Sequence, residues 1–138
     1  PQITQVGRIP KTEFFRSIER YEAETLPDSL FVRVDENIFF ANANNIEAKL
    51  LELMGQAEFP RHLIIVCSAI NRIDSTGLQM LSRLNRRLEE SDSFLHLSDL
   101  KGTLLNKLDH NDLESRLSGK IFQTANAGMI QLKEDRQS

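Results

Sequence analysis

Hydrophobic and polar residues follow two different rhythms along this chain. The stretch Leu63–Cys67 is apolar at every position, and such a run is typical of a strand that a sheet buries on both faces. Further on, leucine recurs every three or four residues, at Leu78, Leu81, Leu84 and Leu88. This spacing places the four side chains in one stripe and predicts an amphipathic helix.

The same patterns predict the other elements. We expect further strands at Ile3–Arg8, Leu30–Val34, Ile38–Phe40, Phe94–Leu97 and Ile121–Gln123. We expect further helices after the polar segment Asn42–Asn45, after Gly102, at Leu113–Leu117 and at Ala125–Lys133. Because only a polar turn separates Leu30–Val34 from Ile38–Phe40, residues 30–40 are predicted to form a hairpin. Glu13–Tyr21 is expected to be irregular or a short helical turn, and Glu134–Ser138 a frayed polar tail.

Strands and helices alternate in this order, which predicts an α/β fold whose helices cross between parallel strands. The 138 residues suffice for one domain and are too few for two ordinary ones. An apolar content of 40% and a charged content of 27% indicate a globular chain. We therefore expect one domain over residues 1–138.

Charge and cysteine content narrow the class of protein. A net charge of −3 argues against a general nucleic-acid binder, which needs a basic face. Cys67 is the one cysteine, so no intrachain disulfide can form, and its place at the end of an apolar strand predicts a small core residue. Arg83, Arg86 and Arg87 are expected on the solvated face of their helix.

The chain begins at Pro1 rather than at Met, and a strand is predicted almost at once. No apolar run approaches the ~18 residues of a membrane span, and no signal peptide is present. We expect a piece cut from a longer protein, so the absence of these signals says little about the parent.

Motifs for catalysis are absent from the sequence. His62, His96 and His110 are far apart and are expected at the surface or at strand edges rather than in a metal site. No phosphate-binding glycine loop, dinucleotide fingerprint or serine-hydrolase motif occurs. The prediction is a protein that binds or signals, with no enzyme activity, no cofactor and no metal.

The most informative stretch joins the apolar strand to the leucine-striped helix. It contains three small polar residues and a glycine: Asp74, Ser75, Thr76 and Gly77. Thr76 to Gln79 fits a T-x-x-Q capping box, although Asp74 or Ser75 could equally be the N-cap. A helix start also exposes unpaired N–H groups that favour anions, and a hydroxyl there is open to a kinase. Both a cap alone and a cap that also recognises a partner fit these residues.

The stretch "NRIDSTGLQML" resembles the D-S-[ST]-[GA]-L signature of STAS domains, which occur in bacterial anti-sigma-factor antagonists and in the cytoplasmic C-terminal part of SulP/SLC26 anion transporters. Three other stretches resemble the transporter branch: "VGRIPKTEFFRSIERYEAETLPDSLFVRVDENIFFANA", "FLHLSDLKGTLLNKL" and "GKIFQTANAGM". Together the resemblance covers the chain from about Val6 to Leu132.

The resemblance implies a mixed four- to five-stranded sheet with helices mainly on one face. It also implies a non-catalytic regulatory domain of a membrane permease for sulfate, bicarbonate or a carboxylate, lying on the cytoplasmic face of the (inner) cell membrane. The implied partners are the transmembrane domain of the same transporter and a cytoplasmic regulatory protein or a nucleotide, with a homodimer formed through the parent. The loop Asp74–Gly77 would be the contact surface, with Asn42, Asn44 and Asn45 nearby.

The antagonist branch implies a different role, because its hydroxyl residue before the glycine is phosphorylated by a partner kinase. Carried to this sequence, that residue is Thr76. Two positions separate the branches. Gly77 stands where SulP domains often have alanine, which favours the antagonists. Phe39 and Phe40 stand where antagonists usually carry an acidic residue, which favours a transporter domain.

Overall fold

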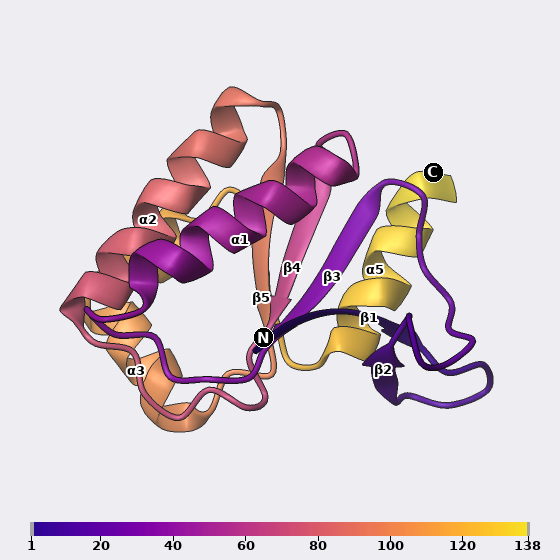
Figure 1. Cartoon of the computed structure of the whole chain (residues 1–138), viewed down its shortest axis with the longest axis horizontal. Coiled ribbons are helices and arrows are strands. Elements are labelled where there is room, and N and C mark those ends of the chain that lie inside the picture. Colours follow the sequence, from indigo (N-terminus) through magenta and orange to yellow (C-terminus); the bar gives the residue numbers. More distant parts are fainter. Residues whose placement is uncertain (1, 138) are drawn as a thin grey trace.

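The computed structural model describes residues 2–137, and over these residues the chain folds around a sheet of six strands (Figure 1). Their order in the sheet is β2-β1-β3-β4-β5-β6. β3, β4, β5 and β6 run parallel, while β1 lies antiparallel to both β2 and β3. The bounds are β1 Ile3–Arg8, β2 Phe15–Ser17, β3 Ser29–Val34, β4 His62–Val66, β5 Phe94–Ser98 and β6 Ile121–Phe122.

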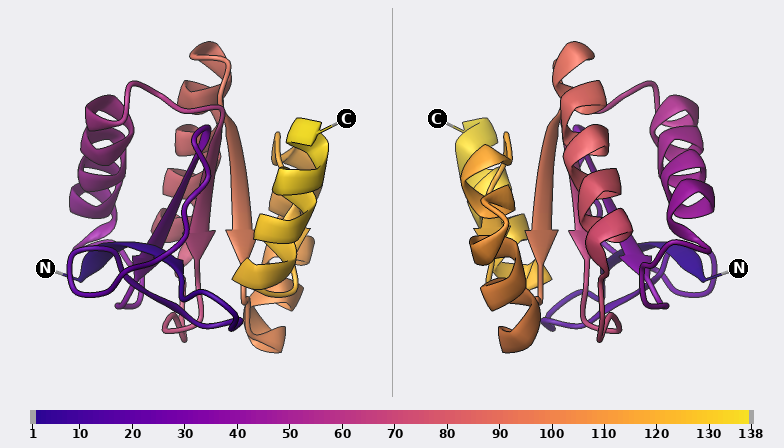
Figure 2. Two further views of the ribbon diagram at one scale, coloured as in Figure 1. Left: turned by 90° about the vertical axis from the view of Figure 1, so that its right-hand side faces the viewer. Right: turned by 90° about the vertical axis from the view of Figure 1, so that its left-hand side faces the viewer.

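Helices cover the two faces of the sheet unequally (Figure 2). The helices are α1 Ala43–Gln56, α2 Ser75–Glu90, α3 Gly102–His110, α4 Leu113–Arg116 and α5 Ala125–Gln137. Residues of α1, α2, α3 and α4 pack on one face in a large aliphatic cluster, and α5 packs on the other face in a smaller one. The expected α/β fold with helices mainly on one face is confirmed.

The alternation of side chains along the strands explains how both clusters form. In β4, Leu63 and Ile65 belong to the larger cluster, while Ile64 and Val66 belong to the smaller one. This strand is therefore buried on both faces, as its continuous apolar run predicts. The leucine stripe of α2 is likewise confirmed, because Leu78, Leu81, Leu84 and Leu88 are all buried.

The predicted hairpin over residues 30–40 is wrong. β3 pairs with β1 and β4, and Ile38 makes only an isolated parallel bridge to Ile73. The polar turn after β3 therefore leads the chain away from that strand and along the connection between β4 and α2. An alternation of apolar and polar residues with a period of two shows that a segment is extended, but it does not show which segment lies beside it.

Short or terminal elements account for the other differences. Residues 15–17, expected to be irregular or helical, pair with β1 as strand β2, so the sheet has six strands across residues 2–137 rather than four or five. The last helix continues through Gln137 where a frayed tail was expected, and Ser138 of that prediction lies outside the described residues. Within residues 2–137 we find no helix with the length and apolar character needed to cross a bilayer.

Candidate functional site

The side chain of Asp74 begins helix α2 and ties it to the segment that precedes α1. Its Oδ1 accepts a hydrogen bond from the backbone N–H of Gly77 at 2.8 Å, so Asp74 is the N-cap. Its Oδ2 accepts from the backbone N–H of Phe40 at 2.9 Å. Of the alternatives left open by the sequence, the Asp74 cap is therefore confirmed, and the capping box with Thr76 as the cap is wrong.

Gly77 lies where two segments approach each other closely. A Cβ at this position would lie 2.7 Å from Cγ2 of Ile73 and 2.8 Å from the carbonyl oxygen of Ile38. A larger residue would therefore push the first turn of α2 away from the segment around Ile38. The glycine is explained by this contact, which the sequence pattern does not reveal.

The two hydroxyl residues of the loop are not used in capping. Ser75 is exposed and Thr76 is half-buried. Among the described residues neither hydroxyl has a hydrogen-bond partner, since the cap is supplied by Asp74 alone. Ser75 is therefore the more accessible of the two to a partner molecule.

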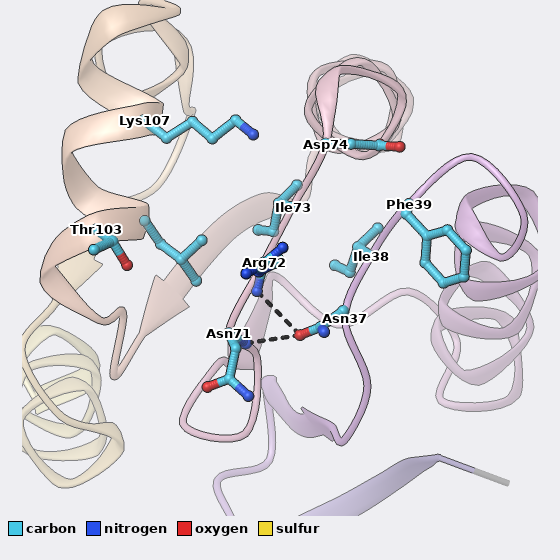
Figure 3. A pocket seen from close by; sticks show the side chains of 10 residues that line it. Asn37, Ile38, Phe39, Asn71, Arg72, Ile73, Asp74, Thr103 and Lys107 are labelled. Carbon is cyan, nitrogen blue, oxygen red and sulfur yellow. Dashed lines mark hydrogen bonds between the residues drawn. The ribbon is translucent and has the colours of Figure 1, made fainter.

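Two asparagines fix the segment that Asp74 contacts. Asn37 Oδ1 accepts from the backbone N–H groups of Asn71 and Arg72 at 2.9 and 3.0 Å (Figure 3). Asn42 donates from Nδ2 to the carbonyl oxygen of Asn37 at 2.7 Å and accepts from the N–H of Phe39 at 2.9 Å. The predicted role of Asn42 in a nearby surface thus competes with a structural one. Asn37 was not among the predicted site residues, and its one visible signal in the sequence is its place in a polar turn.

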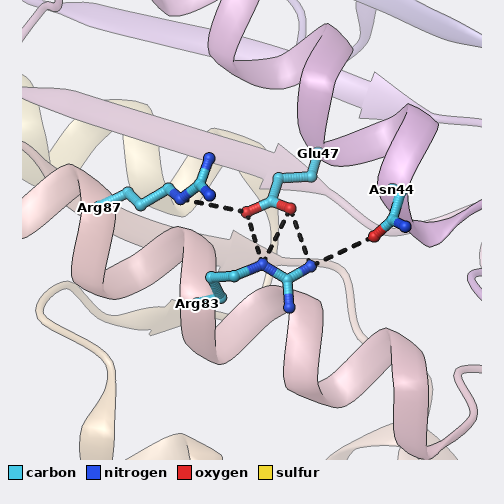
Figure 4. A network of polar contacts seen from close by, with 4 residues as sticks. All are labelled: Asn44, Glu47, Arg83 and Arg87. Atoms are coloured by element: carbon cyan, nitrogen blue, oxygen red, sulfur yellow. Dashed lines mark hydrogen bonds and ion pairs between the residues drawn. The ribbon is translucent and has the colours of Figure 1, made fainter.

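Asn44 and Asn45 are exposed on the first turn of α1, and Asn44 borders a charge network around the buried carboxylate of Glu47 (Figure 4). Glu47 is only 6% exposed and accepts from Arg83 Nε at 3.0 Å and from Arg83 Nη2 at 2.8 Å. Arg83 Nη2 also lies 3.5 Å from Asn44 Oδ1, and Arg87 Nε lies 3.8 Å from Glu47.

The hydrogen bond that Arg83 donates to Glu47 raises the pKa of the Arg83 guanidinium. Arg86 and Arg87 are exposed, as predicted, and Arg83 is 35% exposed. The sequence does not show that Arg83 is also an ion-pair residue that joins α1 to α2.

A groove of about 690 Å³ lies beside Asp74 (Figure 3). Its walls come from the connection after β3, the connection after β4 and the first turns of α3, which follows β5. These segments all leave the carboxyl edge of parallel strands, where ligands bind in open α/β sheets. Its lining consists of Asn37, Ile38, Phe39, Asn71, Arg72, Ile73, Asp74, Thr103, Leu104 and Lys107.

Cys67 is buried, as expected, and its thiol lies 3.4 Å from the carbonyl oxygen of Ile65. Burial raises the pKa of this thiol to about 12. A thiolate, the reactive form of cysteine, is therefore scarce at neutral pH.

The histidine prediction is wrong for one residue, because His96 is only 3% exposed. Its Nδ1 accepts from the backbone N–H of Lys120 at 2.9 Å, and its Nε2 lies 2.9 Å from Nδ1 of His62. Burial, followed by the charges of His62 and Lys120, lowers the pKa of His96 to about 4, and burial also lowers the pKa of His62. Within residues 2–137 no three His, Cys, Asp or Glu residues gather in a metal-binding cluster.

Comparison with known proteins supports one family. A family model described as "STAS domain" matches residues 20–127. High affinity sulfate transporter 2 of Stylosanthes hamata is 30% identical over 135 residues, which are 90% of this chain and 20% of that protein. Sulfate transporter 1.3 of Arabidopsis thaliana is 33% identical over 90% of this chain and 21% of its own length. The chain thus spans about a fifth of these relatives.

Solved structures share the fold. The murine Slc26a9 anion transporter superposes over 94% of this chain and 22% of its own, with a TM-score of 0.81 and 17% identity. A sulfate transporter family protein from Wolinella succinogenes superposes over 85% of this chain and 93% of its own, with a TM-score of 0.71 and 19% identity. An anti-sigma factor antagonist from Mycobacterium paratuberculosis superposes over 95% of this chain and 94% of its own, with a TM-score of 0.67 and 17% identity.

Proposed function

The chain belongs to the STAS domain family, and from that premise we propose that it is the non-catalytic regulatory and interaction domain of a SulP-type anion transporter. The parent would carry sulfate, bicarbonate or a carboxylate through its own transmembrane part. The domain, residues 1–138, would lie on the cytoplasmic face of the membrane and contact that transmembrane part.

One observation carries this proposal. The chain matches sulfate transporters over 90% of its own length while covering only about 20% of theirs. A match of this kind fits a terminal domain appended to a much larger protein. The 30–33% identity to transporters supports that branch more strongly than the fold does, since structures of both branches superpose on this chain.

Within this proposal the loop Asp74–Gly77 is the contact surface. Asp74 and Gly77 hold the loop in shape, Ser75 presents an exposed hydroxyl, and Asn44 and Asn45 lie on the neighbouring helix start. Because the loop is braced from two sides, a partner would meet a preformed surface and lose little entropy in ordering it.

The first test is the coding sequence upstream of Pro1. Several apolar segments of about 20 residues are expected there. The second test is sulfate uptake by the complete protein in cells without uptake of their own. Ser75→Arg places a bulky charge on the loop, and Ser91→Arg makes the same change at the far end of α2. We expect uptake to change by at least about twofold for Ser75→Arg alone, at equal membrane abundance. Equal uptake by both variants would contradict the role of the loop.

A second candidate function is that of a free-standing anti-sigma-factor antagonist switched at Thr76. The observation in its favour is that the superposition with an antagonist structure covers 95% of this chain and 94% of the antagonist. A phosphate on Thr76 would add about 1.5 to 2 negative charges beside Asp74 and weaken docking through the loop. A start codon within a few residues of Pro1, together with phosphate on Thr76 by mass spectrometry and none in Thr76→Val, would favour this function over the transporter.

A further inference from the structure

Two phenylalanines provide the exposed apolar surface at the edge of the groove beside Asp74. Phe39 lines the groove and is 41% exposed, and Phe40 stands next to it with 74% exposure and in T-shaped contact. Ile38, Ile73 and Leu104 also line the groove, but each is at least 98% buried and shows almost no surface to a ligand. The groove therefore continues into an apolar surface that no described residue covers.

The rim of the groove is positively charged. Arg72 lines one side and Lys107 the other, and neither side chain has an ion-pair partner among residues 2–137. Figure 3 shows Lys107 extending from α3 toward the segment that carries Asp74. Lys101 hydrogen-bonds to Asn71 at the same edge. The only carboxylate in the lining is that of Asp74, and both its oxygens already accept backbone N–H bonds.

We propose that this groove binds an acidic peptide segment of a partner protein, with a leucine or phenylalanine of the segment against Phe39 and Phe40 and flanking carboxylates at Arg72 and Lys107. This inference rests on the function proposed above and names the partner chemistry of the groove that adjoins the loop Asp74–Gly77 at Asp74. The occupant follows from charge complementarity, since the chain as a whole carries −3 while this rim carries unpaired positive charges. An inorganic anion would satisfy the rim but leave the exposed phenylalanines uncovered.

The charge of the rim supplies the sharpest test. The probe is a short fluorescein-labelled peptide with glutamates on both sides of a central Leu-Phe pair, and its binding to the 138-residue chain is followed by fluorescence anisotropy. The double variant Arg72→Glu/Lys107→Glu should raise the Kd about tenfold or more. Binding by the unchanged chain should weaken as salt is added, because exposed charges are screened.

A matched control separates the groove from net charge. Arg20 and Lys133 are exposed and lie outside the groove, and Arg20→Glu/Lys133→Glu changes the net charge by the same amount. This variant should leave the Kd within about twofold of the original, as rim charges act locally. A peptide with lysines in place of the glutamates should not compete, and neither should one with serines in place of Leu-Phe.

Backbone amide shifts locate the peptide independently of any substitution. We expect shifts at residues 37–39, 71–74 and 103–107. Equal losses of affinity in the two double variants would overturn the assignment. So would amide shifts confined to other residues, or a groove whose amides respond to a nucleotide and not to the peptide. The two proposals fail separately. Specific peptide binding without an upstream membrane domain would remove the transporter function and keep the groove. Uptake that responds to Ser75→Arg without peptide binding would keep the function and remove the groove assignment.

Discussion

The two faces of the sheet are built from different chemistry. The face under α1 to α4 is filled by aliphatic side chains and also holds the buried thiol of Cys67. The face under α5 is smaller and rich in rings: Phe31 and Phe122 pack there, and the ring of His96 stacks on that of Phe122 with centroids 5.4 Å apart. The larger face should therefore dominate stability, whereas the smaller face should make stability depend on pH.

The largest expected effect is a cavity in the larger face. Leu84 on α2 is 0% exposed, and Leu84→Ala should lower the free energy of unfolding by about 3 kcal/mol. Met129→Ala under α5 should cost less, about 2 kcal/mol, because the smaller cluster contains fewer buried residues and α5 can move toward the gap. Denaturant unfolding of both variants measures the difference, and equal costs would show that the two faces are equally rigid.

Acid should destabilise the smaller face by a similar amount. The pKa of His96 is lowered to about 4, so the unfolded chain binds a proton more readily than the folded one. The stability that the neutral, buried His96 ring contributes is complete above about pH 6.5 and is lost as the pH falls toward 4. The free energy of unfolding should fall by about 3 kcal/mol over this range. Asp28 and Asp135 oppose this shift at the two rings, whereas Arg61 and Lys120 add to it.

Unfolding measured between pH 7 and 4 tests this dependence. His96→Gln should flatten the decline, since the amide can accept from Lys120 and carries no titrating proton. His110→Gln should leave the decline unchanged, because His110 is exposed at the end of α3. A decline that is as steep in His96→Gln as in the original chain would assign it to other groups, among them His62, whose pKa is also lowered.

A smaller effect is expected where the larger face meets solvent. Arg83→Leu leaves the buried carboxylate of Glu47 with only the distant Arg87 at 3.8 Å. The loss should be about 2 kcal/mol, below the figure for a fully buried pair because Arg83 is 35% exposed. Arg86→Leu, one turn along the same helix and exposed, should change stability by less than about 0.5 kcal/mol. Chemical denaturation distinguishes the two, and equal losses would remove the special role of the Glu47 pair.

The smallest effect concerns reactivity rather than stability. Cys67 lies in the larger cluster with 2% exposure and a pKa of about 12, so a thiol reagent should modify it only when the chain opens. Its labelling rate at pH 7 should therefore follow the unfolding equilibrium and rise in Leu84→Ala. Rapid labelling of the native chain would show that the aliphatic face opens more easily than its packing suggests.

Much of the fold could be predicted because each strong pattern reflects local physics. The all-apolar strand around Ile64 and the leucine stripe through Leu84 were recognised, since burial on two faces and burial on one stripe leave different periods in the sequence. Short strands were missed or misplaced for the opposite reason. β2 has three residues, too few to show a period, and it forms because β1 lies beside it.

The candidate site could likewise be predicted only in part. The loop Asp74–Gly77 was identified from its composition, and Asp74 was one of its possible caps. That the same carboxylate also holds Phe40, which is 34 residues away, could not be predicted, because only the parallel arrangement of β3 and β4 brings the two connections together. The pairing of His62 with His96 depends in the same way on the alignment of β4 with β5.

By itself, then, the sequence determined the α/β class, the family resemblance, the buried faces of the main elements and the position of the loop before α2, all of which depend on neighbouring residues in the chain. The tertiary structure alone decided the bond from Asp74 to Phe40, the closeness that excludes a side chain at Gly77, the burial of His96 and the positive groove between Arg72 and Lys107. Those features join residues far apart in sequence, and no local period records such a contact.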